Sequence, residues 1–229
     1  MSFSILFEDD YFLAAEKPPG LPSQATVDKT RPSFFTELAK QLRAERGEDF
    51  YLALHHRLDR DTSGVMIFAK NKEANIPLAD LFKDHRIQKT YVCFTKKVPS
   101  REPWQVKNFL AEAPRTNAKP ARMTAVNSGG QTAHTFFEVI EKLQKGFFVQ
   151  AQPKTGRMHQ IRVHLSESGC GIFGDDLYPC PTVPKPPRLM LHAERLEFIH
   201  PFTHEKILIE SPLPQDMIDF GNLLNPAFD

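Results

Sequence analysis

The sequence lacks the features of several protein classes. Its three cysteines form no CxxC pair, so Cys93, Cys170 and Cys180 indicate neither a disulfide framework nor a cysteine zinc site. No apolar run approaches the roughly 18 residues that a membrane span needs. The N-terminal residues MSFSILFEDD turn acidic where a signal peptide would be basic and then apolar. These absences favour a soluble cytoplasmic protein without a membrane partner.

A strong net charge is also missing. The formal net charge is only +1, so overall composition does not indicate a nucleic-acid partner. The stretches KDHRIQKTYVCFTKK (83–97) and RTNAKPAR (115–122) are nevertheless locally basic. Such a local excess can neutralise RNA phosphates, although a solvated protein surface explains the same pattern.

The sequence consists largely of short apolar segments separated by turn residues. The chain has 229 residues, 41% of them hydrophobic, which is enough for a substantial core. Runs of β-branched and aromatic residues between turn residues predict strands at 4–7, 12–16, 51–55, 64–69, 90–95, 106–110, 121–126, 133–140, 146–152 and after 187. The proline-rich segment 178–188 predicts an extended surface loop. Together these elements predict an α+β fold around an extended, mainly antiparallel sheet.

Three segments have helical periodicity. After Ser33, a suitable N-cap, apolar residues recur at i, i+3, i+4 and i+7 within 35–42. A second helix is predicted within 75–85, with Pro77 in its first turn. A third is predicted over 157–168, with Thr155 as N-cap and Gly169 as the stop signal.

The third predicted helix has an arginine in its apolar face. Met158, Ile161 and Leu165 define that face, and Arg162 falls inside it. An arginine cannot lose its charge, so its burial requires a carboxylate or a phosphate. Either the side chain extends to the solvent at the rim or it pairs with an acid, for which Asp59 is the obvious candidate. Such a pair would keep Asp59 ionised and positioned, as a nucleophile or base requires.

The segment HHRLDRDTSG (55–64) contains several charged and imidazole side chains, and the apolar run VMIFA follows it directly. One interpretation is a metal-dependent hydrolase, with ligands drawn from His55, His56, Asp59, Asp61, His159, His164 and His192. Adjacent histidines on an extended segment point to opposite faces, and the sequence shows no further carboxylate cluster. These two observations weigh against a metal site.

Several motifs resemble those of the RluA-type pseudouridine synthase family. HRLDRDTSG (56–64) is similar to its HRLDxxTSG signature, and PKTGRMHQIRVHL (153–165) to its TGRxHQIRxH helix. The segments DDYFLAAEKPPGLPSQ, QKTYVCF, GDDLYP and RLMLHAERLEFIHPFT resemble further family elements. They follow the family's order from about residue 9 to residue 210, which is far more specific than any single motif.

The resemblance implies the pseudouridine-synthase fold with a central active-site cleft, and an isomerase that converts uridine to pseudouridine in RNA. Substrate and product are isomers, so no cofactor or metal is expected. The resemblance implies that Asp59 is the essential catalytic residue, either attacking C1′ or removing a ribose proton. It makes Tyr91 the ring that stacks on the uracil, Arg162 the basic partner of Asp59, and Leu191 an apolar wall under the base.

Other residues of the signature would contact or support the substrate. The resemblance implies that Arg57 holds the flipped nucleotide, although a local pair within its own loop is the alternative. Thr62 would shape the loop, and His56 is more readily a structural residue than a proton carrier.

We expect a single catalytic domain over 1–229, without an N-terminal RNA-binding domain of the S4 type, that acts as a monomer. Its expected partner is a stem-loop of 23S ribosomal RNA or transfer RNA. A non-catalytic RNA-binding protein is the remaining alternative.

Overall fold

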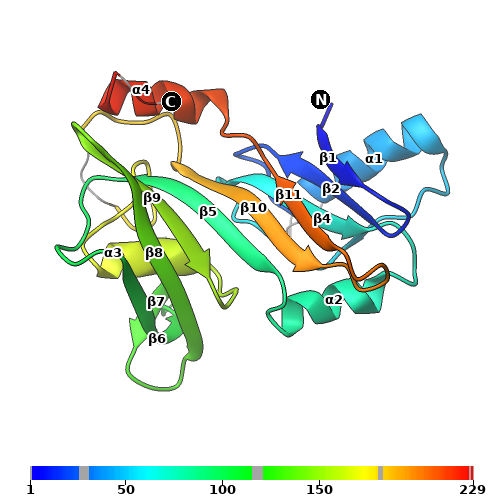
Figure 1. Ribbon diagram of the computed structural model, residues 1–229, viewed down its shortest axis with the longest axis horizontal. Helices are drawn as coiled ribbons and strands as arrows, with labels where there is room; N and C mark the ends of the chain where they lie inside the picture. Colours follow the sequence, from blue (N-terminus) through cyan, green and yellow to red (C-terminus); the bar gives the residue numbers. More distant parts are fainter. Residues whose placement is uncertain (1, 26–30, 115–120, 180–182, 227, 229) are drawn as a thin grey trace. The chain divides into compact units, whose positions relative to one another are not determined.

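The computed structural model describes residues 2–25, 31–114, 121–179, 183–226 and 228. The chain divides into two compact units (Figure 1). The first unit contains residues 1–89 and 193–212, and the second contains residues 90–192 and 213–229. The prediction of one catalytic domain over the whole chain is not tested by this division and stays a prediction.

The first unit combines antiparallel strands with two helices (Figure 1). Strand β2 pairs with β1 and β4, β3 pairs with β4, and β10 pairs with β11. The bounds are β1 (Ile5–Glu8), β2 (Phe12–Lys17), α1 (Phe34–Arg46), β3 (Ala53–Leu54), β4 (Ser63–Ala69), α2 (Asn75–Lys83), β10 (Leu191–Ile199, from residue 193 in this unit) and β11 (Lys206–Glu210). Every residue of β4 is buried, so this strand forms the centre of the first unit.

The second unit has the strand order β5-β9-β8-β6-β7, and these neighbours are antiparallel. The bounds are β5 (Gln88–Thr95, from residue 90 in this unit), β6 (Trp104–Glu112), β7 (Met123–Val126), β8 (Gln131–Leu143), β9 (Gly146–Pro153), α3 (Gln160–Glu167) and α4 (Gln215–Leu224). Apolar residues of β5, β9, α3 and α4 join one buried cluster, which holds the two helices to the strands.

Most predicted elements are confirmed within a few residues. Helix α1 begins after Ser33, whose hydroxyl accepts the Thr36 N–H while its own N–H donates to the Thr36 hydroxyl. Helix α4 was not predicted from the sequence. Its buried residues Met217, Phe220, Gly221 and Leu224 nevertheless have helical spacing.

The predicted start of the third helix is wrong. Helix α3 begins at Gln160, because His159 adopts a left-handed conformation with φ 54° that interrupts the helical turn. Thr155 does not cap it, and Met158 lies outside the helix with 37% of its surface exposed. Gly169, with φ 70°, follows the helix end as predicted.

Two predicted segments lie partly outside the described residues. Of the proline-rich segment 178–188, residues 180–182 are not described, and residues 183–188 form neither helix nor strand. Of the basic stretch 115–122, residues 115–120 are not described.

Gly64 allows a close approach between two segments of the first unit. A Cβ atom at this position would lie 2.2 Å from the carbonyl oxygen of Ala193 and 2.6 Å from its nitrogen. The backbone also has φ +120°, a conformation that residues with a side chain rarely adopt. Any side chain at position 64 therefore displaces the backbone at the start of the β10 segment in this unit.

Two histidines, the partly buried His56 and the buried His164, make hydrogen bonds as neutral rings. The Nε2 atom of His56 accepts the Ile67 N–H at 2.9 Å, and burial, with Lys89 and His55 nearby, lowers the pKa of His56 to about 3. In the second unit, the ring nitrogens of His164 contact Thr135 Oγ1 at 2.9 Å and Asn108 Oδ1 at 3.0 Å. Burial, with His134 nearby, lowers the pKa of His164 to about 4.

Replacing Gly64 by alanine should lower the free energy of unfolding by at least about 2 kcal/mol, from overpacking and backbone strain. Gly129→Ala is the matched control, because Gly129 also has positive φ (+76°) but no atom lies within 4 Å of the place that its Cβ would occupy. It should lose only the roughly 1 kcal/mol of strain. Urea denaturation measures both losses, and equal losses would show that the contact with Ala193 is unimportant.

Stability should fall in mild acid. Below pH 6.5 the unfolded chain protonates its histidines, whereas His56 and His164 stay neutral in the folded state until about pH 3 and about pH 4. The free energy of unfolding should therefore drop by about 1.4 kcal/mol per pH unit for each of them between pH 6 and 5. Urea denaturation across this range measures the slope. His56→Gln should reduce the slope by about 1.4 kcal/mol per pH unit, and a slope that His56→Gln leaves unchanged would contradict this prediction.

Candidate functional site

The loop between β3 and β4 carries Asp59 and is bound on both sides of it. The hydroxyl of Ser23 donates to the Leu58 carbonyl at 2.7 Å and accepts the Leu58 N–H at 2.9 Å. The ammonium of Lys17 donates to the carbonyl of Arg60 at 2.9 Å. Both backbone neighbours of Asp59 are thus fixed by side chains of Lys17, the last residue of β2, and of the segment that follows it.

Lys17 is an unusual anchor because its side chain is completely buried, with 0% exposure. A buried ammonium requires hydrogen-bond acceptors. Besides Arg60, the carbonyls of Pro18 and Leu21 accept from it, both at 2.8 Å. The same charge therefore closes the turn after β2 and attaches this turn to the Asp59 loop.

The other residues of this loop have distinct surroundings. The carbonyl of Asp59 accepts the Thr62 N–H at 3.2 Å, and the Thr62 side chain is buried, so Thr62 supports the turn. Arg57 is exposed. Arg60 forms an exposed ion pair with Asp61 at 2.9 Å. Two of the charged side chains of segment 55–64 therefore pair with each other.

His56 packs inside the first unit. Its ring stacks on Phe82 with a centroid distance of 4.4 Å and an interplanar angle of 19°. Because Nε2 accepts the Ile67 N–H and the pKa is strongly lowered, the ring is neutral at pH 7. This geometry supports the structural role predicted for His56.

Tyr91 and Leu191 belong to the second unit. Tyr91 lies on β5 opposite Ala151 of β9, and its partly buried ring packs against the apolar cluster of the unit. Leu191, only 3% exposed, is a member of that cluster.

Arg162 is buried and paired with an acid. Only 5% of it is exposed, so the alternative in which it reaches the solvent is wrong. Its Nε and Nη2 donate to the two carboxylate oxygens of Asp175 at 2.8 and 2.7 Å. Two parallel charge-assisted hydrogen bonds fix the plane of the guanidinium.

Asp175 is itself held by the backbone. Its Oδ1 accepts the N–H groups of Leu177 at 3.0 Å and Tyr178 at 2.9 Å. The Tyr178 ring centroid lies 5.4 Å from the Arg162 guanidinium carbon, and burial raises the pKa of the Tyr178 hydroxyl. Arg162 is therefore positioned by a carboxylate and an aromatic ring from one short segment.

The structure brings the predicted residues together in two groups. Arg57, Asp59, Thr62 and His56 lie in the first unit, whereas Tyr91, Arg162 and Leu191 lie in the second. The pairing of Arg162 with Asp59 stays a prediction. Sequence reasoning missed Lys17, Ser23 and Asp175 as supporting residues, although the segments KPPGLPSQ and GDDLYP that contain them carry the family resemblance.

The described residues contain no group of three or more His, Cys, Asp and Glu side chains arranged to hold a metal ion. Among the same residues, no helix has the length and apolar character required to cross a membrane.

Known proteins resemble this chain over most of its length. Residues 11–167 match the family model for RNA pseudouridylate synthase. Ribosomal large subunit pseudouridine synthase C of Yersinia pestis is 37% identical over 222 residues, which cover 93% of this chain and 66% of that protein. Its namesake in Rickettsia bellii is 32% identical over 213 residues, covering 92% and 68%. The chain thus spans about two thirds of the length of these curated relatives.

Solved structures agree with these matches. Human RNA Pseudouridylate Synthase Domain Containing 4 has a TM-score of 0.75 at 27% identity, covering 93% of this chain and 90% of that one. Human RNA Pseudouridylate Synthase Domain Containing 1 has a TM-score of 0.74 at 26% identity, covering 92% and 83%.

These similarities confirm the predicted α+β pseudouridine-synthase fold and the predicted class, an isomerase that acts on RNA. They do not favour a metal-dependent hydrolase or a non-catalytic RNA-binding protein. The chain belongs to the RNA pseudouridylate synthase family.

Proposed function

We propose that the protein isomerises a uridine of large-subunit ribosomal RNA to pseudouridine, with Asp59 as the catalytic residue. The observation that carries the proposal is the fixation of the Asp59 loop at both Leu58 and Arg60 by side chains of the first unit. The ribosomal substrate is taken from the names of the relatives, which are ribosomal large subunit pseudouridine synthases.

The reaction breaks the bond between N1 of the uracil and C1′ of the ribose and joins C1′ to C5 of the same base. The base turns within the pocket between these steps, and the proton on C5 is lost while N1 gains one. Atoms therefore balance without a cofactor. Asp59 acts at the ribose, as a nucleophile at C1′ or as a base. The target nucleotide must leave its stack to reach the carboxylate.

The second unit supplies the groups proposed to hold the base. Tyr91 stacks on the uracil, with its hydroxyl a candidate for removing the C5 proton, and Leu191 forms an apolar wall. The partial burial of Tyr91 against the apolar cluster supports this role, because a ring packed on one side presents a defined surface.

Arg162 is proposed to pair with Asp59 and to keep it ionised. A guanidinium has five N–H donors, and Asp175 engages those on the edge formed by Nε and Nη2. We assign the opposite edge to Asp59. Asp175 is then a positioning residue, since it acts on the reaction through Arg162.

Exposed cations of the first unit are proposed to bind the RNA backbone. Arg57 would hold the flipped nucleotide, and its exposure supports this role; Lys83 and Arg86 are exposed as well. Thr62 and His56 would support the loop without touching the substrate. The burial of Thr62 and its N–H bond to the Asp59 carbonyl, and the hydrogen bond that His56 accepts from the Ile67 N–H, support this role.

Replacing Asp59 by asparagine should reduce turnover on the order of a thousand-fold or more, because the amide can neither attack C1′ nor accept a proton as a base. Release of tritium from ribosomal RNA labelled at uracil C5 measures the turnover. Asp61→Asn is the matched control, since Asp61 pairs with the exposed Arg60, and it should retain normal activity. Normal turnover by Asp59→Asn would refute the assignment, and an inactive wild type would favour the binding-only alternative.

Removing the Arg162 charge should abolish most activity, but the single variant Arg162→Met also leaves the Asp175 carboxylate buried alone. That uncompensated charge should cost about 3–5 kcal/mol of stability. The double variant Arg162→Met/Asp175→Asn removes this charge, and the asparagine oxygen still accepts the two backbone N–H groups.

We expect the double variant to be folded by circular dichroism and inactive in tritium release. Asp175→Asn alone leaves the buried guanidinium without its carboxylate and should lose a comparable amount of stability. The protein that stays folded should show a lower kcat with a smaller change in KM, because Arg162 is present but less firmly oriented. A folded double variant with normal turnover would overturn the proposed role of Arg162.

A further inference from the structure

One face of the sheet in the second unit is not used by the proposed catalytic groups. In register, Ala151 of β9 pairs with Tyr91 of β5 on one side and with Phe137 of β8 on the other. Directly paired residues of antiparallel strands share a face, and their neighbours along each strand point to the other. Phe136 and Gln152 therefore lie on the face opposite Tyr91.

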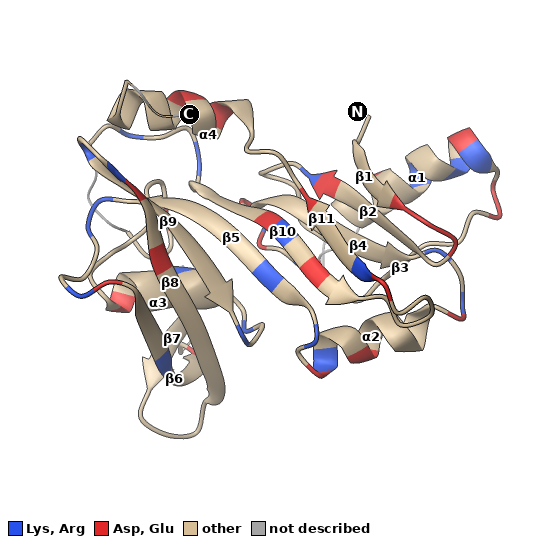
Figure 2. Cartoon of the chain, viewed as in Figure 1, with Lys and Arg blue, Asp and Glu red and all other residues tan. Residues whose placement is uncertain are grey.

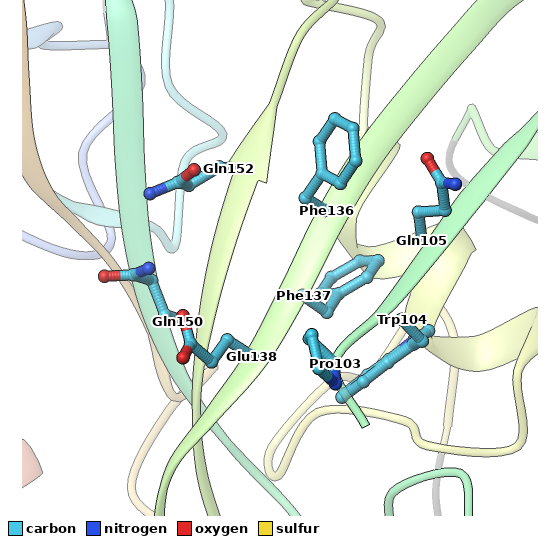
Figure 3. A pocket seen from close by; sticks show the side chains of 8 residues that line it. All are labelled: Pro103, Trp104, Gln105, Phe136, Phe137, Glu138, Gln150 and Gln152. Carbon is cyan, nitrogen blue, oxygen red and sulfur yellow. The ribbon is translucent and has the colours of Figure 1, made fainter. Parts of the chain in front are cut away.

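A pocket of about 380 Å³ opens where β6, β8 and β9 run together. Figure 3 shows Phe136 between Gln105 and Gln152, and these three residues are also partners in register. Gln150 and Glu138 line another part of the pocket. Phe136 is 38% exposed, so its aromatic ring is available to a ligand from the solvent.

Two lysines lie near this ring, and the acidic Glu138 lines the same pocket. The ammonium of Lys154 lies 5.7 Å from the Phe136 ring centroid, and Lys107, the only basic residue of β6, pairs in register with His134 (Figure 2). The His134 ring lies 4.5 Å from that of Phe136. Burial lowers the pKa of His134, and the neighbouring Lys107 and Lys154 lower it further.

These side chains form what we call the β8 patch, which consists of Gln105, Lys107, His134, Phe136, Gln152 and Lys154. An exposed ring on an open sheet face stacks an unpaired base, whichever base it is. Lysines beside the ring neutralise the adjoining phosphates. Glutamine amides offer both a donor and an acceptor to the edge of the base. By register, Phe109 of β6, which is 43% exposed, lies on the same face as Phe136. Exposed rings among lysines and amides match unpaired bases and their phosphates better than the broad apolar centre of a protein interface.

We propose that the β8 patch binds an unpaired nucleotide of the RNA substrate at a site separate from the one in which uridine is isomerised. The proposal rests on the proposed function in that the substrate is RNA. Because the patch faces away from Tyr91, the nucleotide that it binds is not the one that reacts. The patch therefore adds affinity for RNA that has an unpaired segment away from its target uridine.

The test uses a fluorescein-labelled oligoadenylate of about twelve nucleotides, which contains no uridine and cannot be a substrate. Fluorescence anisotropy should show binding that weakens with salt. Phe136→Ala should weaken it by about 5- to 100-fold, the effect of one lost stacking contact. Lys154→Gln should weaken it and reduce the slope of log affinity against log salt by about one.

Leu208→Ala is the matched control, because Leu208 is also an exposed apolar strand residue, 49% exposed, but lies on β11 in the first unit. It should bind oligoadenylate as the wild type does. Equal affinities of Phe136→Ala and Leu208→Ala, or no binding by the wild type, would overturn the proposal.

Tritium release from ribosomal RNA separates this proposal from the proposed function. Phe136→Ala should turn over normally at saturating RNA and show a raised KM. A wild type that binds oligoadenylate through Phe136 but releases no tritium would refute the proposed function. It would not refute RNA binding at the β8 patch. An active wild type whose KM does not respond to Phe136→Ala would refute the β8 patch alone.

Discussion

The buried ammonium of Lys17 is the interaction on which the candidate site most depends. It gathers the carbonyls of Pro18, Leu21 and Arg60 around one positive charge. Removing an ammonium from water is unfavourable unless such acceptors surround it. The turn after β2 and the loop that carries Asp59 therefore depend on each other for their folded conformations. The position of Asp59 is consequently a property of the folded first unit and not of a flexible loop.

The second unit applies the same principle with a different pair of groups. Arg162 is held by both oxygens of Asp175, and Asp175 is held by backbone N–H groups. Charged groups that are oriented before the substrate arrives need no reorganisation during the reaction, and this is a large source of catalytic power. In the first unit the supporting charge, Lys17, binds the residue next to Asp59, and in the second unit the supporting charge, Asp175, binds Arg162 itself.

The sequence was sufficient for the elements whose signals are local. Ser33 and the apolar series after it predict α1. Arg162 in an apolar face left two outcomes open, extension to the solvent or pairing with an acid, and the sequence named Asp59 and not the observed Asp175 as the acid. Contacts between distant segments were not predictable in this way. Lys17 resembles any surface lysine until its carbonyl partners are known, and Asp175 lies in an irregular segment without periodicity. The left-handed conformation of His159, which shortens α3, has no signal in the residue type.

The short segment from Asp175 to Tyr178 separates Arg162 from the proline-rich segment that follows. Asp175 binds α3 through Arg162, and the Tyr178 hydroxyl accepts the Met123 N–H at 2.7 Å. These two contacts hold the segment at both of its ends. The chain beyond Tyr178 returns to the same place, because a Cβ atom at Gly174 would lie only 2.0 Å from the carbonyl oxygen of Arg188. The proline-rich segment therefore begins and ends beside the carboxylate that orients the buried arginine.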